Sequence, residues 1–208
     1  MATTVLLDGT PVSCPDATLQ GAIRAGRAAA GSRLIVEVRA DGVVIDPDAP
    51  AMGMGGISRI EMLSADPIAL ARAALLEAAD RLEEIATVQA DAAGFLQTGE
   101  TERAMGLLMR SRETWGGVVQ TIELISQTDL LSTGAPPMLG GVPLREAHTR
   151  LNGCLRSVIE ALTAQDHAAL ADVLAYDLRD LAREWTADLR RLAEAPAARG
   201  SGTARSVG

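Results

Sequence analysis

Few residues of this chain belong to the types that build catalytic or metal-binding sites. The 208 residues include two histidines, His148 and His167, two cysteines, Cys14 and Cys154, and no lysine. Without a lysine amine, a Schiff-base enzyme, a lysine general base and a Walker-type phosphate loop are excluded. The histidines and cysteines, with no CxxC pair, are too few for a zinc cluster. We therefore expect no catalytic residue, no cofactor and no metal ion.

Three local patterns invite a chemical interpretation, but each favours a structural one. Glu146 and His148 have the wrong spacing for the Glu-x-x-His ligands of di-iron helical proteins, and His148 lies near a predicted apolar seam. A nucleophilic Cys154 would need a base and an orienting carboxylate, and Cys154 is one residue from a predicted buried position. The glycine-rich segment 53–56 precedes a strand, whereas phosphate loops open a helix.

The charge balance excludes two further classes of partner. The formal net charge is −8, with 19 basic and 27 acidic residues and only two Trp, one Tyr and one Phe. Nucleic-acid binding needs a basic surface and stacking rings, so we expect no nucleic-acid partner. No stretch of 18 residues is apolar and free of charge, and the first residues lack a secretory signal pattern. We therefore expect no membrane span and a cytoplasmic location.

The elements that must position any site differ between the two parts of the chain. In residues 1–64, Asp8-Gly9 and Asp41-Gly42 each separate two apolar runs, which predicts two tight hairpins. A short helix is predicted over 18–30, started by Asp16, and a further strand over 57–63. This order of elements resembles the ubiquitin-like β-grasp in topology. The Gly-Gly ending of conjugated proteins is lacking, so their chemistry does not carry over.

From Asp66-Pro67, an N-cap followed by a first-turn proline, the pattern becomes helical. Helices are predicted over 67–97, 101–127, 144–165 and 166–195, the last started by Asp166, with a long loop over 132–143. We predict an α+β fold: a small β-grasp-like amino-terminal domain, residues 1–64, followed by an antiparallel four-helix bundle, residues 66–195. Residues 196–208 are predicted to be a disordered tail.

The helical spacing also predicts which side chains are buried. The first helix has a seven-residue repeat that includes Ile68, Leu82 and Gln89. The other predicted core positions are Ala104, Leu108, Ser111, Trp115, Val118, Ile122 and Ile125, then Leu144, Ala147, Leu151, Leu155, Val158 and Leu162, and finally Leu170, Leu174, Leu178, Leu181, Trp185 and Leu192. Acidic residues between these positions, such as Asp80, Glu83 and Asp188, are interpreted as solvated ion-pair faces.

The helical part resembles the flagellin export chaperone family. Residues 97–104, with the sequence QTGETERA, are similar to the Gly-acidic turn and second helix of that family, and residues 161–185 resemble its last helix. The resemblance covers about 68–192. The chain differs from the family in that it lacks the Leu-Tyr-Asp-Gly-Ala stretch of the first helix, and a β-rich domain replaces a short amino-terminal arm.

The resemblance implies a cytosolic, non-enzymatic chaperone that binds the carboxy-terminal helices of flagellin before secretion. A client segment would lay an apolar helical face into grooves between the bundle helices. The candidate groove residues are Leu108, Trp115, Val118, Ile122, Leu174, Leu178, Leu181 and Trp185. We expect more than half of them to be purely structural.

Two other hypotheses remain open at this point. The chain could be a two-domain adaptor or assembly protein, in which a sheet edge accepts a partner strand and the bundle supplies a homodimer interface. It could also be an enzyme whose site the sequence patterns do not identify.

Overall fold

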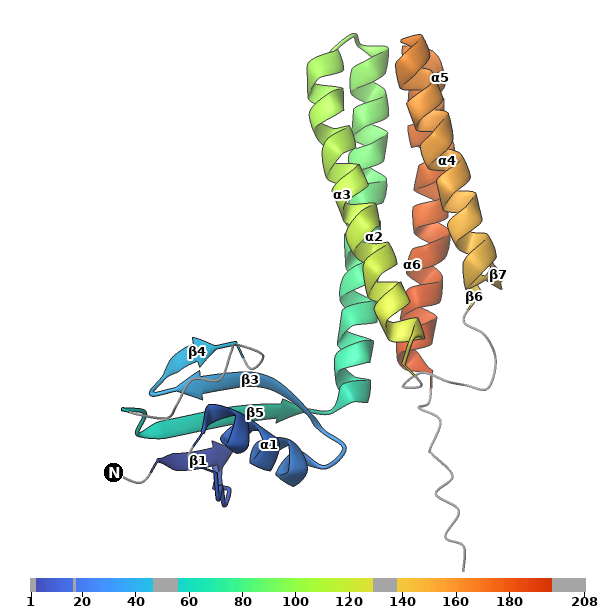
Figure 1. Ribbon diagram of the computed structural model, residues 1–208. Coiled ribbons are helices and arrows are strands. Elements are labelled where there is room, and N and C mark those ends of the chain that lie inside the picture. Colours follow the sequence, from blue (N-terminus) through green and yellow to red (C-terminus); the bar gives the residue numbers. More distant parts are fainter. Residues whose placement is uncertain (1–2, 17, 47–55, 129–137, 196–208) are drawn as a thin grey trace, which may run out of the picture. The chain divides into compact units, whose positions relative to one another are not determined.

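The computed structural model describes residues 3–16, 18–46, 56–128 and 138–195, and shows a mixed α+β chain (Figure 1). Two compact units divide between Leu70 and Ala71, a few residues after the expected boundary. The predicted tail, residues 196–208, lies outside the described residues, as do parts of the predicted glycine-rich segment and of the long loop.

The amino-terminal unit is a small mixed sheet with one helix packed on it. Its strands are β1 (Thr4–Leu7), β2 (Thr10–Pro11), β3 (Leu34–Ala40), β4 (Val43–Ile45) and β5 (Arg59–Ala65). Their order is β2-β1-β5-β3-β4, with β1 and β5 parallel and the other neighbours antiparallel. Helix α1 (Leu19–Ala30) buries Leu19, Ala22 and Ile23 against apolar side chains of the sheet.

Both predicted hairpin turns are confirmed. Asp8 and Gly9 have φ angles of 50° and 80°, and Asp41 and Gly42 have φ angles of 47° and 86°. Positive φ at both central residues gives the turn a twist that matches the flanking strands, which is why Asp-Gly is favoured there.

The start of α1 corrects one sequence interpretation. Thr18, and not Asp16, is the N-cap, because the Thr18 hydroxyl accepts a hydrogen bond of 3.0 Å from the Gly21 amide. Asp16 instead forms an exposed ion pair of 3.1 Å with Arg24.

The second unit is helical. It contains α2 (Pro67–Gln97), α3 (Thr101–Ser126), the short strands β6 (Met138–Leu139) and β7 (Val142–Pro143), α4 (Leu144–Ala164), α5 (His167–Asp172), the π-helical segment η2 (Val173–Leu178) and α6 (Arg179–Glu194). Asp66 Oδ1 accepts a 2.7 Å hydrogen bond from the Ile68 amide, and Asp166 Oδ1 accepts one of 2.9 Å from the Ala169 amide. Both predicted N-caps are therefore confirmed.

The last predicted helix is interrupted by η2. Segments α5, η2 and α6 follow one another directly, so the chain stays helical over the expected range but widens for one π segment. Leu170, Leu174 and Leu178 are each 0% exposed and stand four residues apart. Two successive steps of four exceed the α-helical turn of 3.6 residues, and the wider π turn keeps these three side chains in the core.

Part of the predicted loop forms a hairpin, β6–β7, which contacts the helices through a buried side chain and hydrogen bonds. Leu139 is fully buried in the core of the helical unit. The Gly140 amide donates a 2.6 Å hydrogen bond to Asp188 Oδ2, and Arg150 donates one of 3.1 Å to the Gly140 carbonyl. The interpretation of Asp188 as part of a solvated face is therefore wrong: this carboxylate is 7% exposed because the hairpin covers it.

Most predicted core positions are buried, with seven exceptions. Leu162 is 37% exposed, and six others are only partly buried: Ile68, Leu108, Ile125, Leu144, Leu155 and Leu192. Ala161 and Leu189 are buried where the sequence pattern favoured Leu162 and Leu192. The cores of the two units share no residue among those described.

Candidate functional site: a groove between α2 and α6

The residues predicted to line a client groove form the interior of the helical unit instead. Seven of the eight are buried: Trp115, Val118, Ile122, Leu174, Leu178, Leu181 and Trp185. Leu108 is partly buried and packs against the same core. These side chains face one another at helical spacing, so in this structure they fill the space between the helices and leave no open groove among them.

A pair of tryptophans marks the centre of this interior. The rings of Trp115 and Trp185 meet edge to face, with centroids 5.3 Å apart and an interplanar angle of 83°. The ring of His148 lies 6.1 Å from that of Trp185, and its Nδ1 is 3.9 Å from Glu123 Oε1. An edge-to-face aromatic pair such as Trp115 and Trp185 contributes about 0.5–1.5 kcal/mol of stability beyond the burial of area. His148 is thus part of a packed aromatic layer.

An open groove does exist on the surface between α2 and α6. It has a volume of about 510 Å³. It is lined by Glu83, Ala86, Thr87, Ala90, Arg179, Arg183, Thr186, Ala187 and Arg190. The α2 members and the α6 members each recur at three- and four-residue spacing, so each set lies on one face of its helix.

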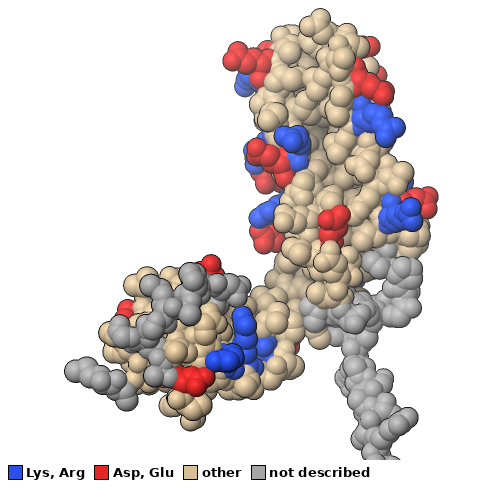
Figure 2. Space-filling view, in the orientation of Figure 1, with Lys and Arg blue, Asp and Glu red and all other residues tan. Residues whose placement is uncertain are grey.

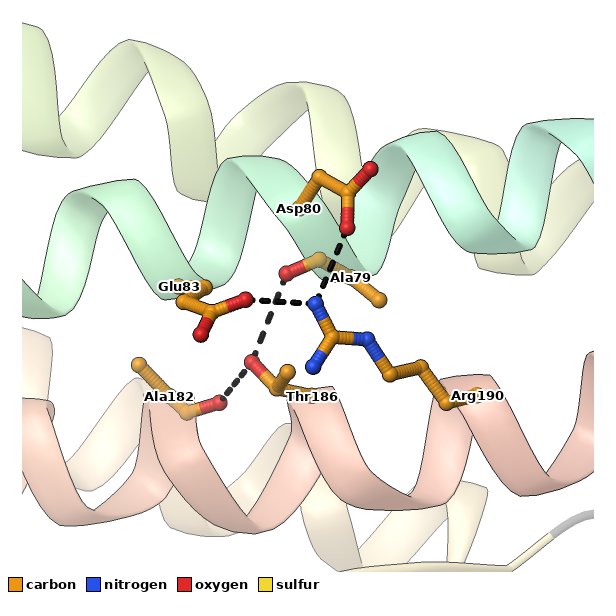
Figure 3. Close-up of polar contacts among 6 residues, drawn as sticks. All are labelled: Ala79, Asp80, Glu83, Ala182, Thr186 and Arg190. Atoms are coloured by element: carbon orange, nitrogen blue, oxygen red, sulfur yellow. Dashed lines mark hydrogen bonds and ion pairs between the residues drawn. The ribbon is translucent and has the colours of Figure 1, made fainter.

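The floor of the groove is made of small side chains. Ala86 is 7% exposed and Thr186 is 8% exposed. The Thr186 hydroxyl donates 2.8 Å to the Ala182 carbonyl and lies 3.5 Å from the Ala79 carbonyl (Figure 3). Because this hydroxyl is already hydrogen bonded, the floor offers a neighbour mainly methyl surface.

An ion-pair bridge lies beside the floor. The Arg190 guanidinium extends from α6 between two carboxylates of α2 (Figure 3), and donates 3.0 Å to Asp80 Oδ1 and a second hydrogen bond to Glu83. These bonds raise the pKa of Arg190 above its usual value. The sequence interpretation placed Asp80 and Glu83 on a solvated ion-pair face, and it missed this bridge because the partner is more than a hundred residues away.

Two other arginines of the groove share one carboxylate, that of Asp180. Arg179 Nε is buried without a hydrogen bond in the part of the chain that the structure describes, and lies 3.7 Å from Asp180 Oδ1. Arg183 reaches the same carboxylate oxygen at 3.8 Å, and its side chain is 63% exposed. Three carboxylates, those of Asp80, Glu83 and Asp180, thus lie within ion-pair distance of the three arginines of the groove.

The rest of the helical surface offers scattered apolar side chains. Met109 and Leu124 of α3 and Ile159 of α4 are 54%, 59% and 62% exposed. Figure 2 shows most of the charged side chains of this unit toward its two margins, with an acidic group and uncharged surface between them.

The described residues offer little for catalysis or membrane insertion. They contain no cluster of three or more His, Cys, Asp or Glu side chains suited to a metal ion. Both cysteines are free, and burial, aided by the charge of Asp177, raises the pKa of the Cys154 thiol, which disfavours the nucleophilic thiolate. Along the described segments, no helix combines the length and the apolar character that crossing a bilayer requires.

Comparisons of the chain with protein-family models, with curated proteins and with solved structures found no match. No residue of the groove therefore receives a role from a relative.

Proposed function

We propose that this protein is a non-enzymatic chaperone that holds an amphipathic helical segment of a client protein in the groove between α2 and α6. The open groove of about 510 Å³ is the observation that carries the proposal. Its small side chains allow a third helix to approach closely, because interaxial distance depends on the side chains at the contact. A client segment that is disordered alone would fold as it binds, and the ordering cost keeps the complex reversible.

The proposal includes the finer architecture. The sheet order, the parallel central pair β1 and β5, and α1 across one face support a β-grasp-like amino-terminal domain. In the helical unit, ion pairs join α2 to α6, α2 to α3, and α4 to α6. These pairs support an antiparallel four-helix bundle in which α5, η2 and α6 together act as the fourth helix.

The carboxy-terminal helices of flagellin are the first client to test, on the strength of the resemblance of residues 97–104 and 161–185. We propose a cytoplasmic location for this activity, and neither nucleic acid nor a membrane as a partner. The net charge of −8 supports this, since it repels nucleic acid and keeps the unloaded chaperone apart from other copies.

The role of the groove in client binding can be tested by placing a large side chain in it. Ala187 is exposed and lines the groove, whereas Ala73 of α2 is also exposed but lies outside it. With a fluorescent peptide of the flagellin carboxy terminus, Ala187→Phe should weaken binding tenfold or more, and Ala73→Phe should leave it unchanged. Both variants should melt like the wild type. Equal binding by the two variants would contradict the groove as the client site.

One observation favours the adaptor hypothesis as a second candidate. Strand β4 is the outermost strand on its side of the sheet, and Val43 and Val44 are 67% and 61% exposed. An apolar edge strand is a template for strand addition by a partner or a second copy. Val43→Lys should abolish such pairing. Light scattering should then show a dimer for the wild type and a monomer for the variant, and a monomeric wild type would exclude self-association at this edge.

A further inference from the structure

The contacts that hold the β6–β7 hairpin on α4 and α6 are those of a peptide-binding site. The carboxylate of Asp188, a residue that is 7% exposed, accepts a hydrogen bond of 2.6 Å from the Gly140 amide. Arg150 donates one of 3.1 Å to the Gly140 carbonyl, and the preceding side chain, Leu139, is 0% exposed in the helical core. Main-chain hydrogen bonds combined with a buried side chain are the means by which proteins bind extended segments.

This site favours glycine after the buried leucine. Gly140 has a φ angle of 59°, in the left-handed region, and a Cβ atom added to it would lie 2.8 Å from Glu184 Oε2 and 2.9 Å from Arg150 Nη1. Arg150 and Glu184 form an ion pair of 3.2 Å, so moving either side chain aside would disturb that pair. The backbone angle and the close contacts together select a Leu-Gly pair.

An open pocket adjoins the hairpin site. Its volume is about 230 Å³. It is lined by Arg150, Cys154, Tyr176, Asp177, Asp180, Leu181 and Glu184. Arg150 and Glu184 therefore belong both to this pocket and to the surroundings of Gly140, whereas no described residue of the hairpin lines the pocket. A longer segment with a Leu-Gly pair can extend into the pocket and gain contacts that the hairpin does not make.

We infer that α4 and α6 form a recognition site for a Leu-Gly segment of a partner protein, and that the β6–β7 hairpin is the internal ligand that this segment displaces. Within the described ranges, the polar contacts of the hairpin with the helices all meet Gly140, so a partner with the same two residues can replace them. A tethered ligand competes at a high effective concentration, and the adjoining pocket supplies the additional contacts that a partner needs. The site shares no lining residue with the α2–α6 groove, and the inference does not rest on the proposed function.

The test uses the full-length protein and a fluorescent peptide with the sequence of residues 138–143. In the wild type the hairpin occupies the site and should keep binding weak. Leu139→Ala removes the buried side chain of the internal ligand, so this variant should bind the peptide about tenfold more tightly in fluorescence anisotropy. The peptide should also raise the melting temperature of the variant, because it binds only the folded state.

A milder variant keeps the test valid if Leu139→Ala does not fold. Leu139→Val removes less of the side chain and should bind the peptide with an affinity between those of the wild type and Leu139→Ala. Circular dichroism identifies the folded variants. Equal binding by the wild type and the folded variants would overturn the competition between peptide and hairpin.

Matched controls locate the binding site. Peptides with alanine in place of the leucine, or of the glycine that follows it, should not bind. In the Leu139→Ala protein, Arg150→Gln should weaken binding about tenfold, because the peptide carbonyl loses its donor. Arg156→Gln should leave binding unchanged, because Arg156 is exposed on α4 outside the site. Unweakened binding by the Arg150→Gln protein, or by the peptide without glycine, would overturn the assignment.

The outcomes separate this inference from the proposed function. Ala187→Phe, added to Leu139→Ala, should leave binding of the hairpin peptide unchanged, because Ala187 lines the α2–α6 groove. Failure of every folded Leu139 variant to bind the peptide would show that the hairpin is only a structural element. That result would overturn the inference and leave the chaperone proposal standing.

Discussion

The surroundings of Trp185 identify it as a structural residue and not as a client-binding one. It is 0% exposed and packs edge to face on Trp115, at the centre of the helical unit. A side chain enclosed in this way contributes contact area to the folded state and offers none to a client. The same holds for Leu174 and Leu178, which the sequence pattern placed at a groove.

Truncation of Trp185 should therefore destabilise the protein without affecting client capture directly. Trp185→Ala should lower the free energy of unfolding by about 3–5 kcal/mol, and Trp185→Leu by less, because leucine keeps part of the apolar volume. Urea denaturation followed by circular dichroism measures both values. A folded Trp185→Leu protein should bind its client peptide as the wild type does. Weakened capture with an unchanged melt would place this ring at the binding site instead.

Asp41 makes the amino-terminal unit sensitive to acid. Hydrogen bonds from Ser58 lower the pKa of Asp41 below its ordinary value of 3.8. The Ser58 hydroxyl donates 2.6 Å to Asp41 Oδ1, and the Arg59 amide donates 2.8 Å to the same oxygen. A carboxylate whose folded-state pKa is depressed stabilises the fold above its unfolded pKa, and this stability is lost as the pH falls through the lowered value.

Asp41→Asn should consequently reduce the loss of stability on acidification. We expect the melting temperature of the sheet signal to fall less steeply for the variant than for the wild type between about pH 5 and pH 2. Asp91→Asn, at an exposed position of α2, serves as the control and should reproduce the wild-type slope. Identical slopes for Asp41→Asn and the wild type would mean that these hydrogen bonds do not persist in solution.

At the scale of elements, α2 and α3 are aligned by one buried polar contact. Gln89 and Ser111 are 0% and 2% exposed, and the Gln89 Nε2 donates 3.0 Å to the Ser111 hydroxyl. Both residues interrupt otherwise apolar seams. A sliding of one helix by a turn would leave both groups buried without a partner, so this contact favours a single register.

Ser111→Ala should therefore lower the free energy of unfolding by more than the small change in side-chain volume suggests. It leaves the buried Gln89 amide without its partner and should lower stability by about 1–3 kcal/mol. The double variant Gln89→Met with Ser111→Ala removes both polar groups and should recover much of this loss. A double-mutant cycle from urea denaturation measures the coupling. Additive effects of the two substitutions would show that the contact does not set the register.

The elements themselves were largely predictable, and the reason is local. The helix limits follow from Asp66-Pro67 and Asp166, and the hairpins follow from the two Asp-Gly pairs, because caps and turns depend on neighbouring residues. The candidate site was not predictable in the same way. The bridge from Arg190 to Asp80 joins positions 110 residues apart, and the groove exists only where small side chains of two distant helices meet.

At the scale of the whole molecule, the two units have separate cores. The amino-terminal core and the helical core share no described residue, and the chain divides between Leu70 and Ala71. Each unit can bury its own apolar surface, which is the physical condition for independent folding.

We therefore expect residues 66–195 to fold without the sheet. Circular dichroism of this fragment should show a helical spectrum and a cooperative thermal transition. The client peptide should bind to it as to the full chain, because the groove belongs to α2 and α6. A random-coil spectrum would show that the helices depend on the amino-terminal unit.

The β6–β7 hairpin has a consequence for the order of folding. Leu139 enters the helical core, and Gly140 is hydrogen bonded to Asp188 of α6 and to Arg150 of α4. Its docking site is therefore complete only after α4 and α6 have come together. We expect the hairpin to settle after the transition state, so that Leu139→Ala accelerates unfolding and leaves the refolding rate nearly unchanged. The hairpin then lowers the unfolding rate, and so determines how long the native helices stay together once formed.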